Sequence, residues 1–506
     1  MFLPDYPTTP AEHAAIARIG VDSGPNASCI SGFDDTVSRM RTPGTKSESC
    51  GSELPLNRIR ERSSISADPA DLAWVRRFRA LLARNIETVC EEVGEELGKP
   101  AFETLTAEIL PLLSACRWTE KRARRVLRPR QVRGGGIFQI GQQHRVVRAP
   151  LGDVAIIATW NYPIQLLGVQ LIHAIAGGNR VWVKPSERTP RSQGLLLDLA
   201  QEAGLGNDRL ARVDASRGAG ERLLTEHNFD HVVFTGSTDV GRSIARTLSE
   251  SLTPSTLELS GSDSAIVLAD ADVDLAARAV AFAIRLNAGQ TCMAPRRVLV
   301  ERGVYERFVA GLAGALAEPR DATTAQPDEL ERSGALARDA VERHGGSWIS
   351  GASGVPPFVV GWQGHETGPA SGLVSGLVSG DHFGPAMAVV GVDSVDEALA
   401  VHAGIPKKLA TAVFTRDLKR ADSLVPRLGS TVVTINDCVV PTGHPGLGIG
   451  GVGESGWGVS RGAEGLLAMT RPVFVSRTGR VVRTPLSEPD AAIRRRIARF
   501  AAWLYG

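Results

Sequence analysis

The sequence predicts an α/β fold whose parallel sheet is covered by helices on both faces. From residue 152 onward, apolar runs long enough only for buried strands alternate with helix-like segments. This alternation is typical of β–α–β units. The chain has 506 residues, more than one hydrophobic core usually holds, so we expect two or three domains. Ligands of such sheets bind at the carboxyl ends of the strands, where the chemical motifs described below lie.

The composition predicts an ordinary globular protein and favours neither a nucleic-acid-binding nor a membrane-spanning one. Apolar residues make up 43% and charged residues 22%, as in ordinary soluble proteins, and a formal net charge of +2 favours no nucleic-acid partner. No run approaches about 18 apolar residues, so we expect no transmembrane span. The N-terminus lacks a basic segment followed by an apolar one, so no secretory signal is expected. The six cysteines show no CxxC or other metal spacing, which predicts no metal site and a reducing, cytoplasmic compartment.

The N-terminal quarter is predicted to be scaffold. Residues 1–65 are rich in Ser, Thr, Pro, Gly and charge, which predicts a loosely structured, flexible segment. Apolar residues recur at helical spacing over 68–98, where Asp71 can cap the helix. A second helix is predicted over 101–126. Neither helix carries a chemical motif.

Two segments have the features of interaction elements. Residues 127–149 alternate between apolar and polar types around Gly134-Gly135-Gly136, which is typical of a β-hairpin arm. Such an arm either pairs with another subunit or forms an edge ribbon on its own chain, and both readings stay open. Residues 489–506 predict a basic amphipathic helix. It either lies in a membrane interface or packs on its own or a neighbouring subunit, and its short length favours packing.

The β–α–β region begins after Gly152 and continues to about residue 252. Its short apolar runs and the segments between them define the expected order of strands and helices. Strands are predicted over 154–158, 181–184 and 231–235, and helices over 164–176, 190–203 and 240–252.

Polar residues follow the first two strands. Asn161, in the run Thr-Trp-Asn-Tyr-Pro, offers an amide NH₂ that can donate to a developing oxyanion, although an asparagine before proline is also common in ordinary loops. Lys184 and Glu187, which flank Pro185-Ser186, can take the ribose hydroxyls of a nucleotide, one as donor and one as acceptor. The alternative is that both are exposed loop charges.

The next two strands end at a glycine turn and at a carboxylate. Gly236 lets the backbone approach a phosphate, and Ser237 lies near a helix N-terminus, where an anion is favoured. A simple capped helix remains the alternative. Glu258 stands between two leucines with Gly261 nearby, so partial desolvation should raise its pKa and suit it to general-base chemistry. The alternative is a Glu paired with a basic residue.

A lone cysteine, Cys292, follows the helical run 276–286 and the helix-ending Gly289. A nucleophile requires such a placement, with its side chain at a cleft and a backbone N–H free for an oxyanion. A buried, unreactive thiol is the alternative. Two further motifs follow: Asp381-His-Phe383-Gly-Pro, before an apolar strand over 386–390, and the glycine-rich loop 448–458.

In this order and at these separations, the motifs resemble the aldehyde dehydrogenase superfamily over roughly residues 68–480. The matching pieces are Trp160-Asn-Tyr-Pro, Lys184-Pro-Ser186-Glu187, the loop at Gly236, Glu258 with Gly261, and the run Asn-Ala-Gly-Gln-Thr-Cys at 287–292. The resemblance implies a Rossmann-like cofactor domain, an α/β catalytic domain and a small β oligomerisation arm. The ranges it implies are 66–126 with 150–258 for NAD(P) binding, 259–469 for catalysis, and 127–149 with 470–487 for the arm. The amphipathic helix at 488–506 lies beyond the resemblance and is predicted from its own pattern.

The resemblance also implies a reaction, the oxidation of an aldehyde to a carboxylic acid. Cys292 attacks the aldehyde, Asn161 and the Cys292 N–H bind the oxyanion, and Glu258 activates water to hydrolyse the resulting thioester. A homodimer or homotetramer is implied as well. The implied cofactor-binding residues are Trp160, Lys184, Ser186, Glu187, Gly236, Ser237, Asp381 and Phe383.

Several residues bear on the cofactor and on competing functions. Glu187 favours NAD, because a 2′-phosphate would meet a negative charge, and NADP stays open. Asp381 stands where the family usually has Glu, and the segment 351–380 is unusual. These two departures motivate the non-enzyme alternative, a binding or structural protein on this fold. A CoA-acylating relative is the enzyme alternative, which the water-activating Glu258 disfavours.

Overall fold

The computed structural model describes residues 68–134, 141–319, 321, 323–363, 376–380, 382–478 and 490–506. The predicted flexible segment 1–65 and the candidate ligand Asp381 lie outside these ranges. So do residues 364–375 of the unusual segment.

A layer of helices begins the described chain. Its elements are α1 Pro69–Arg84, α2 Ile86–Leu97, α3 Ala101–Thr104, the π-helix η2 Leu105–Ile109 and α4 Leu110–Val126. The helix predicted over 68–98 is two helices that meet at Asn85, and Asp71 is not the cap. Helix α1 starts at Pro69, since proline is favoured at the first helical position. Asp68 is therefore the cap, and its Oδ1 accepts from the Ala70 N–H at 2.8 Å. The segment predicted over 101–126 is helical throughout, apart from its single π turn.

The first sheet has the order β17-β7-β6-β3-β4-β5, and all its strands except β17 are parallel to their neighbours. Its strands are β3 Asp153–Ile157, β4 Arg180–Lys184, β5 Leu210–Arg212, β6 His231–Gly236, β7 Ser255–Leu259 and β17 Gly456–Trp457. Its helices are α5 Gln165–Ala176, α6 Pro190–Glu202, α7 Ala219–Glu226 and α8 Thr238–Ser251. The predicted strands and helices fall within two residues of these bounds, and β5 and α7 were not predicted.

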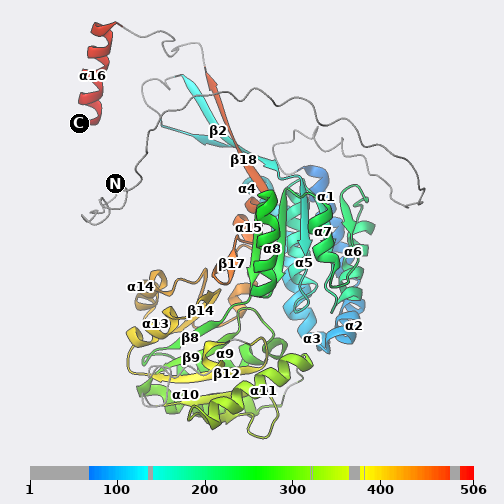
Figure 1. Cartoon of the computed structure of the whole chain (residues 1–506), viewed down its shortest axis with the longest axis vertical. Coiled ribbons are helices and arrows are strands. Elements are labelled where there is room, and N and C mark those ends of the chain that lie inside the picture. The colour runs from blue at the N-terminus through cyan, green and yellow to red at the C-terminus, as the bar shows by residue number, and fades with distance from the viewer. Residues whose placement is uncertain are drawn as a thin grey trace, which may run out of the picture. The chain divides into compact units, whose positions relative to one another are not determined.

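Both faces of the first sheet are buried. Val154 and Ile156 of β3 pack with α1, α5 and α6 in one apolar cluster. Ala155 and Ile157 pack with α7 and α8 in another. Side chains alternate between faces along a strand, so this split buries β3 completely and accounts for its continuous apolar run. The predicted α/β fold with helices on both faces is confirmed (Figure 1).

A second sheet, with the order β10-β11-β12-β9-β8-β14-β15, is parallel except at β10. Its strands are β8 Asp263–Val267, β9 Pro295–Glu301, β10 Ser347–Ser350, β11 Phe358–Trp362, β12 Ala386–Val392, β14 Ala410–Phe414 and β15 Val432–Ile435. Its helical elements are α9 Val273–Arg285, η4 Leu286–Gly289, η5 Arg302–Val304, α10 Tyr305–Ala317, α11 Pro327–Glu342, α12 Gly376–Ser379, α13 Val395–Ala403, α14 Leu418–Leu428 and η7 Val440–Gly443. Of this sheet, only the strand over 386–390 was predicted.

A third sheet forms an arm, in which the predicted hairpin is found. Strand β1 Arg130–Val132 pairs antiparallel with β2 Gln142–Pro150, and β18 Thr470–Thr478 pairs along the whole length of β2. Figure 1 shows β2 and β18 running side by side. The remaining elements are β13 Lys407–Lys408 with β16 Val452–Gly453, α15 Gly462–Ala468 and α16 Ala491–Tyr505. No helix in the described part of the chain is both long and apolar enough to cross a membrane.

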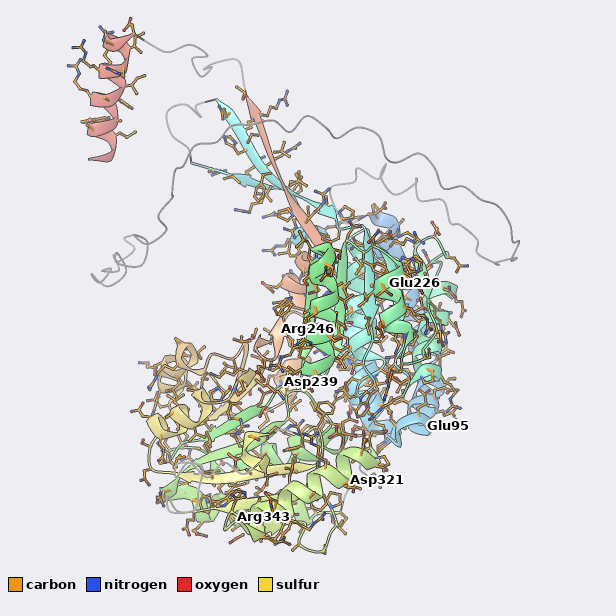
Figure 2. The ribbon with its side chains drawn as sticks, in the orientation of Figure 1. Glu95, Glu226, Asp239, Arg246, Asp321 and Arg343 are labelled. Carbon is orange, nitrogen blue, oxygen red and sulfur yellow. The ribbon has the colours of Figure 1, made fainter. Side chains whose placement is uncertain are left out.

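The parallel register brings the ends of four strands to one edge of the first sheet. Ile157 of β3 is opposite both Lys184 of β4 and Phe234 of β6, and Gly236 is opposite Leu259 of β7. The segments that follow these strands carry the motifs singled out above. Figure 2 shows Asp239, in the first turn of α8, at the end of that helix nearest the second sheet. The predicted motifs therefore converge where the two sheets approach each other.

Candidate active site

Two cavities share the side chains of Cys292 and Glu258. The first, of about 270 Å³, has a mostly apolar lining. Its apolar side chains include Leu166, Phe282, Leu286, Met293, Val439 and Ile449. The second cavity, of about 240 Å³, is also lined by Asn161 and Ser237. The thiol and the carboxylate therefore lie between a mostly apolar cavity and a second cavity with a larger share of polar groups, called the polar cavity below.

The turn before Cys292 has an unusual backbone. After α9, Asn287 and Ala288 have φ of 52° and 51°, and Gly289 has φ of 71°. Left-handed geometry is uncommon for residues other than glycine and is retained only where the surroundings enforce it. A Cβ at Gly289 would lie 2.5 Å from the Gly384 carbonyl oxygen, so only glycine fits there. The helix ends in this segment, as predicted, and the chain reverses to present Cys292.

Contacts from the surroundings hold this turn. The fully buried guanidinium of Arg296 donates to the carbonyl oxygens of Gly289, at 2.8 Å, and Thr291, at 3.1 Å. The Tyr162 hydroxyl lies 2.6 Å from Thr291 Oγ1. Thr291 is thus held through both its backbone and its side chain, which fixes the position of the adjacent Cys292.

Burial and neighbouring charges set the protonation of the two central groups. Burial raises the pKa of the Cys292 thiol to about 12, and the charge of Glu258 adds to the rise. The charges of Arg461 and Arg296 oppose it. Burial also raises the pKa of Glu258, which is 7% exposed and whose Oε1 accepts no hydrogen bond within the described residues. A desolvated carboxylate with an oxygen unused by the protein is a suitable proton acceptor. The predicted pKa rise of Glu258 is thus found.

Asn161 is 3% exposed and its amide is oriented by two hydrogen bonds. Nδ2 donates to the Gln290 carbonyl oxygen at 3.0 Å, and Oδ1 accepts from Thr159 Oγ1 at 3.0 Å. An amide NH₂ carries two hydrogens. One is used by Gln290, so the other remains for an acceptor in the polar cavity.

Trp160 and Phe383 form the aromatic part of the polar cavity. Their ring centroids lie 5.9 Å apart in an edge-to-face arrangement. The Arg188 guanidinium lies 4.9 Å from the centre of the Trp160 ring, and the Phe383 N–H donates to Glu329 Oε2 at 3.1 Å. These contacts join the first sheet's loops to the second sheet's loops around the cavity.

Lys184, Ser186 and Glu187 lie at the end of β4, and none of the three lines either cavity. Lys184 Nζ is buried and donates to Glu187 Oε2 at 3.0 Å. Partial burial acts to raise the pKa of Glu187, but hydrogen bonds and the charges of Lys184 and Arg217 outweigh it, so this pKa is lowered. Ser186 is buried and its Oγ accepts from the Arg188 N–H at 3.3 Å. The carboxylate therefore stays ionised beside the strand end.

Gly236 and Ser237 line the polar cavity at the start of α8. Ser237 caps the helix, with Oγ accepting from the Val240 N–H at 3.4 Å. The helix consequently starts at Thr238, two residues before the predicted start. A Cβ at Gly236 would lie 2.4 Å from the end of the Phe234 ring, so a side chain at this position would force that buried ring to move.

Comparison with known proteins gives the family. A family model described as "Aldehyde dehydrogenase family" matches residues 70–354 and 374–475. The chain belongs to the aldehyde dehydrogenase family. It is thereby an oxidoreductase of aldehydes that depends on NAD or NADP.

Individual relatives agree with this assignment. A probable coniferyl aldehyde dehydrogenase of Pseudomonas aeruginosa is 33% identical over 81% of this chain and 88% of its own length. A 4,4′-diapolycopene aldehyde oxidase of Methylomonas is 31% identical over 78% and 74%. The solved structure of an indole-3-acetaldehyde dehydrogenase of P. syringae, a mutant in complex with NAD⁺ and IAA, has a TM-score of 0.73 and 26% identity, covering 81% of this chain and 84% of that one.

Groups that line the polar cavity of this aldehyde dehydrogenase are chemically suited to two parts of a dinucleotide. The bare backbone at Gly236 and the N-terminus of α8, a helix of 14 residues, offer N–H groups to a phosphate. Trp160 and Phe383 offer apolar ring surfaces beside Cys292. These groups suit a charged diphosphate at one end and a flat ring at the other.

Sequence reasoning missed one group in the aldehyde dehydrogenase's apolar cavity, Arg461. It is buried, lines that cavity with Cys292 and Glu258, and precedes α15 with φ of 63°. Its positive charge acts to lower the pKa of Cys292 and of Glu258, against the larger rise that burial causes. The sequence contains many arginines, and Arg461 differs from the others only in its position just beyond the glycine-rich loop. That position is the one signal that could have identified it. The region predicted as scaffold also contributes Lys99, between α2 and α3, and Glu103 and Glu108 next to the site.

Proposed function

We propose that this aldehyde dehydrogenase oxidises apolar aldehydes to carboxylic acids with NAD⁺ and water. Cys292 is the nucleophile, Asn161 the oxyanion donor and Glu258 the general base. The observation that carries the proposal is the shared position of Cys292 and Glu258 between an apolar and a polar cavity, with Asn161 lining the polar one.

The chemistry follows from the groups around Cys292. The Cys292 thiol first loses its proton to water. The thiolate then attacks the aldehyde carbon, and the oxyanion accepts from Asn161 Nδ2 and the Cys292 N–H. NAD⁺ bound in the polar cavity would accept the hydride that leaves the carbon bonded to Cys292 Sγ, and its positive charge would favour the thiolate. Loss of that hydride converts the adduct on Cys292 into a thioester. Glu258 then takes a proton from water, which hydrolyses the thioester and releases the acid. Arg461 and Arg296 favour the thiolate against the effect of burial.

The apolar lining supports the substrate class. Leu166, Phe282 and Met293 surround the approach to Cys292 and favour aromatic, terpenoid or long aliphatic aldehydes. Arg461 is the one cation among the described residues of this lining, and the charge of Glu258 offsets it, so the carboxylate of a small semialdehyde would gain little for its lost hydration. The names of the relatives, one for coniferyl aldehyde and one for diapolycopene aldehyde, agree with a bulky apolar substrate.

The remaining residue assignments are proposed on the same basis. Trp160 and Phe383 contact the nicotinamide end of the cofactor, and Gly236 and Ser237 bind its diphosphate. Lys184, Ser186 and Glu187 bind the adenosine ribose, with Glu187 favouring NAD⁺ over NADP⁺.

Domain boundaries and assembly belong to the proposal as well. Cofactor binding is assigned to 66–126 with 150–258, and catalysis to 259–469. The arm, 127–149 with 470–487, joins subunits into a homo-oligomer. Phe474 on β18 is 76% exposed, and burial of such a side chain would stabilise a subunit contact. A cytoplasmic, reducing compartment would keep Cys292 as a thiol.

The test is absorbance at 340 nm with purified protein, NAD⁺ and no coenzyme A. Cinnamaldehyde-type, terpenoid and long aliphatic aldehydes are compared with succinic semialdehyde, and Cys292→Ala is the control. NADH formation on the apolar aldehydes, lost in the variant, is the expected result. Turnover on the semialdehyde alone would refute the substrate class, and turnover that survives in Cys292→Ala would refute the nucleophile.

A further inference from the structure

The helical layer reaches the catalytic centre at a single turn. Helix α3 continues into the π-helix η2, and this short stretch carries two buried carboxylates, Glu103 and Glu108. On a regular α-helix, positions five apart differ in direction by about 140°. A π turn is wider, which brings the two carboxylates toward one face, and such turns often occur at functional sites.

Glu108 forms a fully buried ion pair behind Asn161. Its Oε1 accepts from Lys99 Nζ at 2.6 Å, and both side chains are 0% exposed. Lys99 Nζ also donates to the Asn161 carbonyl oxygen at 2.9 Å and lies 4.4 Å from the centre of the Tyr162 ring. Glu108 Oε2 accepts from the Ile164 N–H at 2.8 Å. The pair thus holds the backbone on both sides of Tyr162.

Glu103 makes the corresponding contact to the turn before Cys292. Its Oε1 accepts from the Asn287 N–H at 2.8 Å and from Thr323 Oγ1 at 2.7 Å. Asn287 is the first left-handed residue of that turn. Its Nδ2 in turn donates to the Asn161 carbonyl oxygen at 2.9 Å, so the two supports meet at Asn161.

We infer that Lys99, Glu103 and Glu108 are positioning residues that fix the Asn161 amide relative to the Cys292 turn. The inference rests on the proposed function, because it assigns them to the oxyanion site of that reaction. A fully buried ion pair loses hydration and can often be replaced by apolar residues without loss of stability. We therefore assign the Lys99–Glu108 pair a role in holding the Asn161 segment rather than in stabilising the fold.

The reaction is sensitive to this geometry. An oxyanion donor acts only within hydrogen-bonding distance of the developing charge, and small displacements of positioned groups cost large factors in rate. None of the three side chains lines either cavity at Cys292, so they act through Asn161 and Asn287. Their removal should consequently lower kcat while leaving NAD⁺ affinity nearly unchanged.

The main variant is the double substitution Lys99→Met with Glu108→Gln. It removes both charges together, and the glutamine can still accept from the Ile164 N–H, so no buried charge is left unpaired. Besides the bond between the two replaced side chains, it removes the bond from Lys99 to the Asn161 carbonyl oxygen and the contact of Lys99 with the Tyr162 ring. We expect kcat on an apolar aldehyde to fall on the order of 10–100-fold.

Alkylation of Cys292 by iodoacetamide separates positioning from general damage. That reaction forms no oxyanion, so its rate in the double variant should stay within about threefold of wild type. Glu103→Leu removes the acceptor for the Asn287 N–H, so it should slow both alkylation and turnover. Glu103→Gln keeps an acceptor there and should restore both to within about threefold of the wild-type rates.

The matched control is Glu120→Gln. Glu120 pairs with Arg79 at 2.6 Å and with Arg76 at 3.6 Å in the same helical layer. Both arginines lie on α1, and neither lines either cavity. Its kcat should stay within about twofold of wild type. The inference is wrong if the folded double variant keeps wild-type kcat, or if its alkylation rate falls in parallel with kcat. Wild-type protein without aldehyde turnover would instead refute the proposed function, and the inference with it.

Discussion

Removal of the Asn161 side chain is the sharpest test of the oxyanion assignment. Asn161→Ala deletes the Nδ2 bond to the Gln290 carbonyl oxygen and the Oδ1 bond from Thr159 Oγ1. The backbone carbonyl oxygen of Asn161 keeps its bonds from Lys99 and Asn287. The Gln290 carbonyl oxygen also keeps the Asn287 Nδ2 donor at 3.0 Å. The loop should therefore survive the substitution.

The two consequences of the change differ in size. Loss of an oxyanion donor lowers kcat by on the order of 10²–10³, equivalent to about 2.7–4 kcal/mol of transition-state stabilisation. Loss of two hydrogen bonds lowers the free energy of unfolding by about 1–3 kcal/mol in total. The stability change leaves most molecules folded at 25 °C, so the drop in kcat must come from the chemistry.

Steady-state kcat at 340 nm and thermal unfolding measure the two consequences separately. Thr159→Ala is the control, because it removes the same bond to Oδ1 and leaves the Asn161 amide in place. We expect Thr159→Ala to keep kcat within about tenfold of wild type. The assignment fails if Asn161→Ala loses less than about tenfold in kcat, or if Thr159→Ala loses as much.

Three further outcomes follow from the site. Glu258→Gln should lower kcat on the order of 10²–10⁴, and hydroxylamine, which attacks the thioester without a general base, should restore product release; absence of rescue would contradict the role of Glu258 in hydrolysis. Arg461→Leu removes a charge that lowers the pKa of Cys292 and of Glu258, so both pKa values should rise. The acidic limb of kcat/KM should move to higher pH, and an unmoved limb would exclude the electrostatic role. Glu187→Gln should raise kcat/KM for NADP⁺ relative to NAD⁺ by at least about fivefold, because a repulsion of about 1 kcal/mol or more is removed. An unchanged ratio would place the ribose elsewhere.

The first sheet could be predicted from the sequence because each of its elements carries a local signal. Short apolar runs such as β3 are bounded by glycine or proline, and the helices between them have helical periodicity. The second sheet was mostly missed, because two arginines near the start of β9 interrupt its apolar pattern, β14 lacks such boundaries, and short apolar runs do not distinguish strand from helix. The wrong cap at Asp71 has a local cause as well. Pro69 is a stronger start signal than the apolar spacing on which the prediction relied.

Motifs identified Cys292, Glu258 and Asn161 because each lies at or just beyond the end of a strand or helix that the local sequence indicates. The residues that position them, Lys99, Glu103 and Glu108, have no such local signal in the sequence. Glu103 contacts the Asn287 N–H across 184 residues of sequence, and in its own helix it has the appearance of an ordinary surface carboxylate. Yet the left-handed backbone at Asn287 and Ala288 is intrinsically unfavourable, so the turn that presents Cys292 depends on such distant contacts. The nucleophile's identity is thus encoded locally, whereas its geometry is encoded by buried polar groups that only the folded chain brings together.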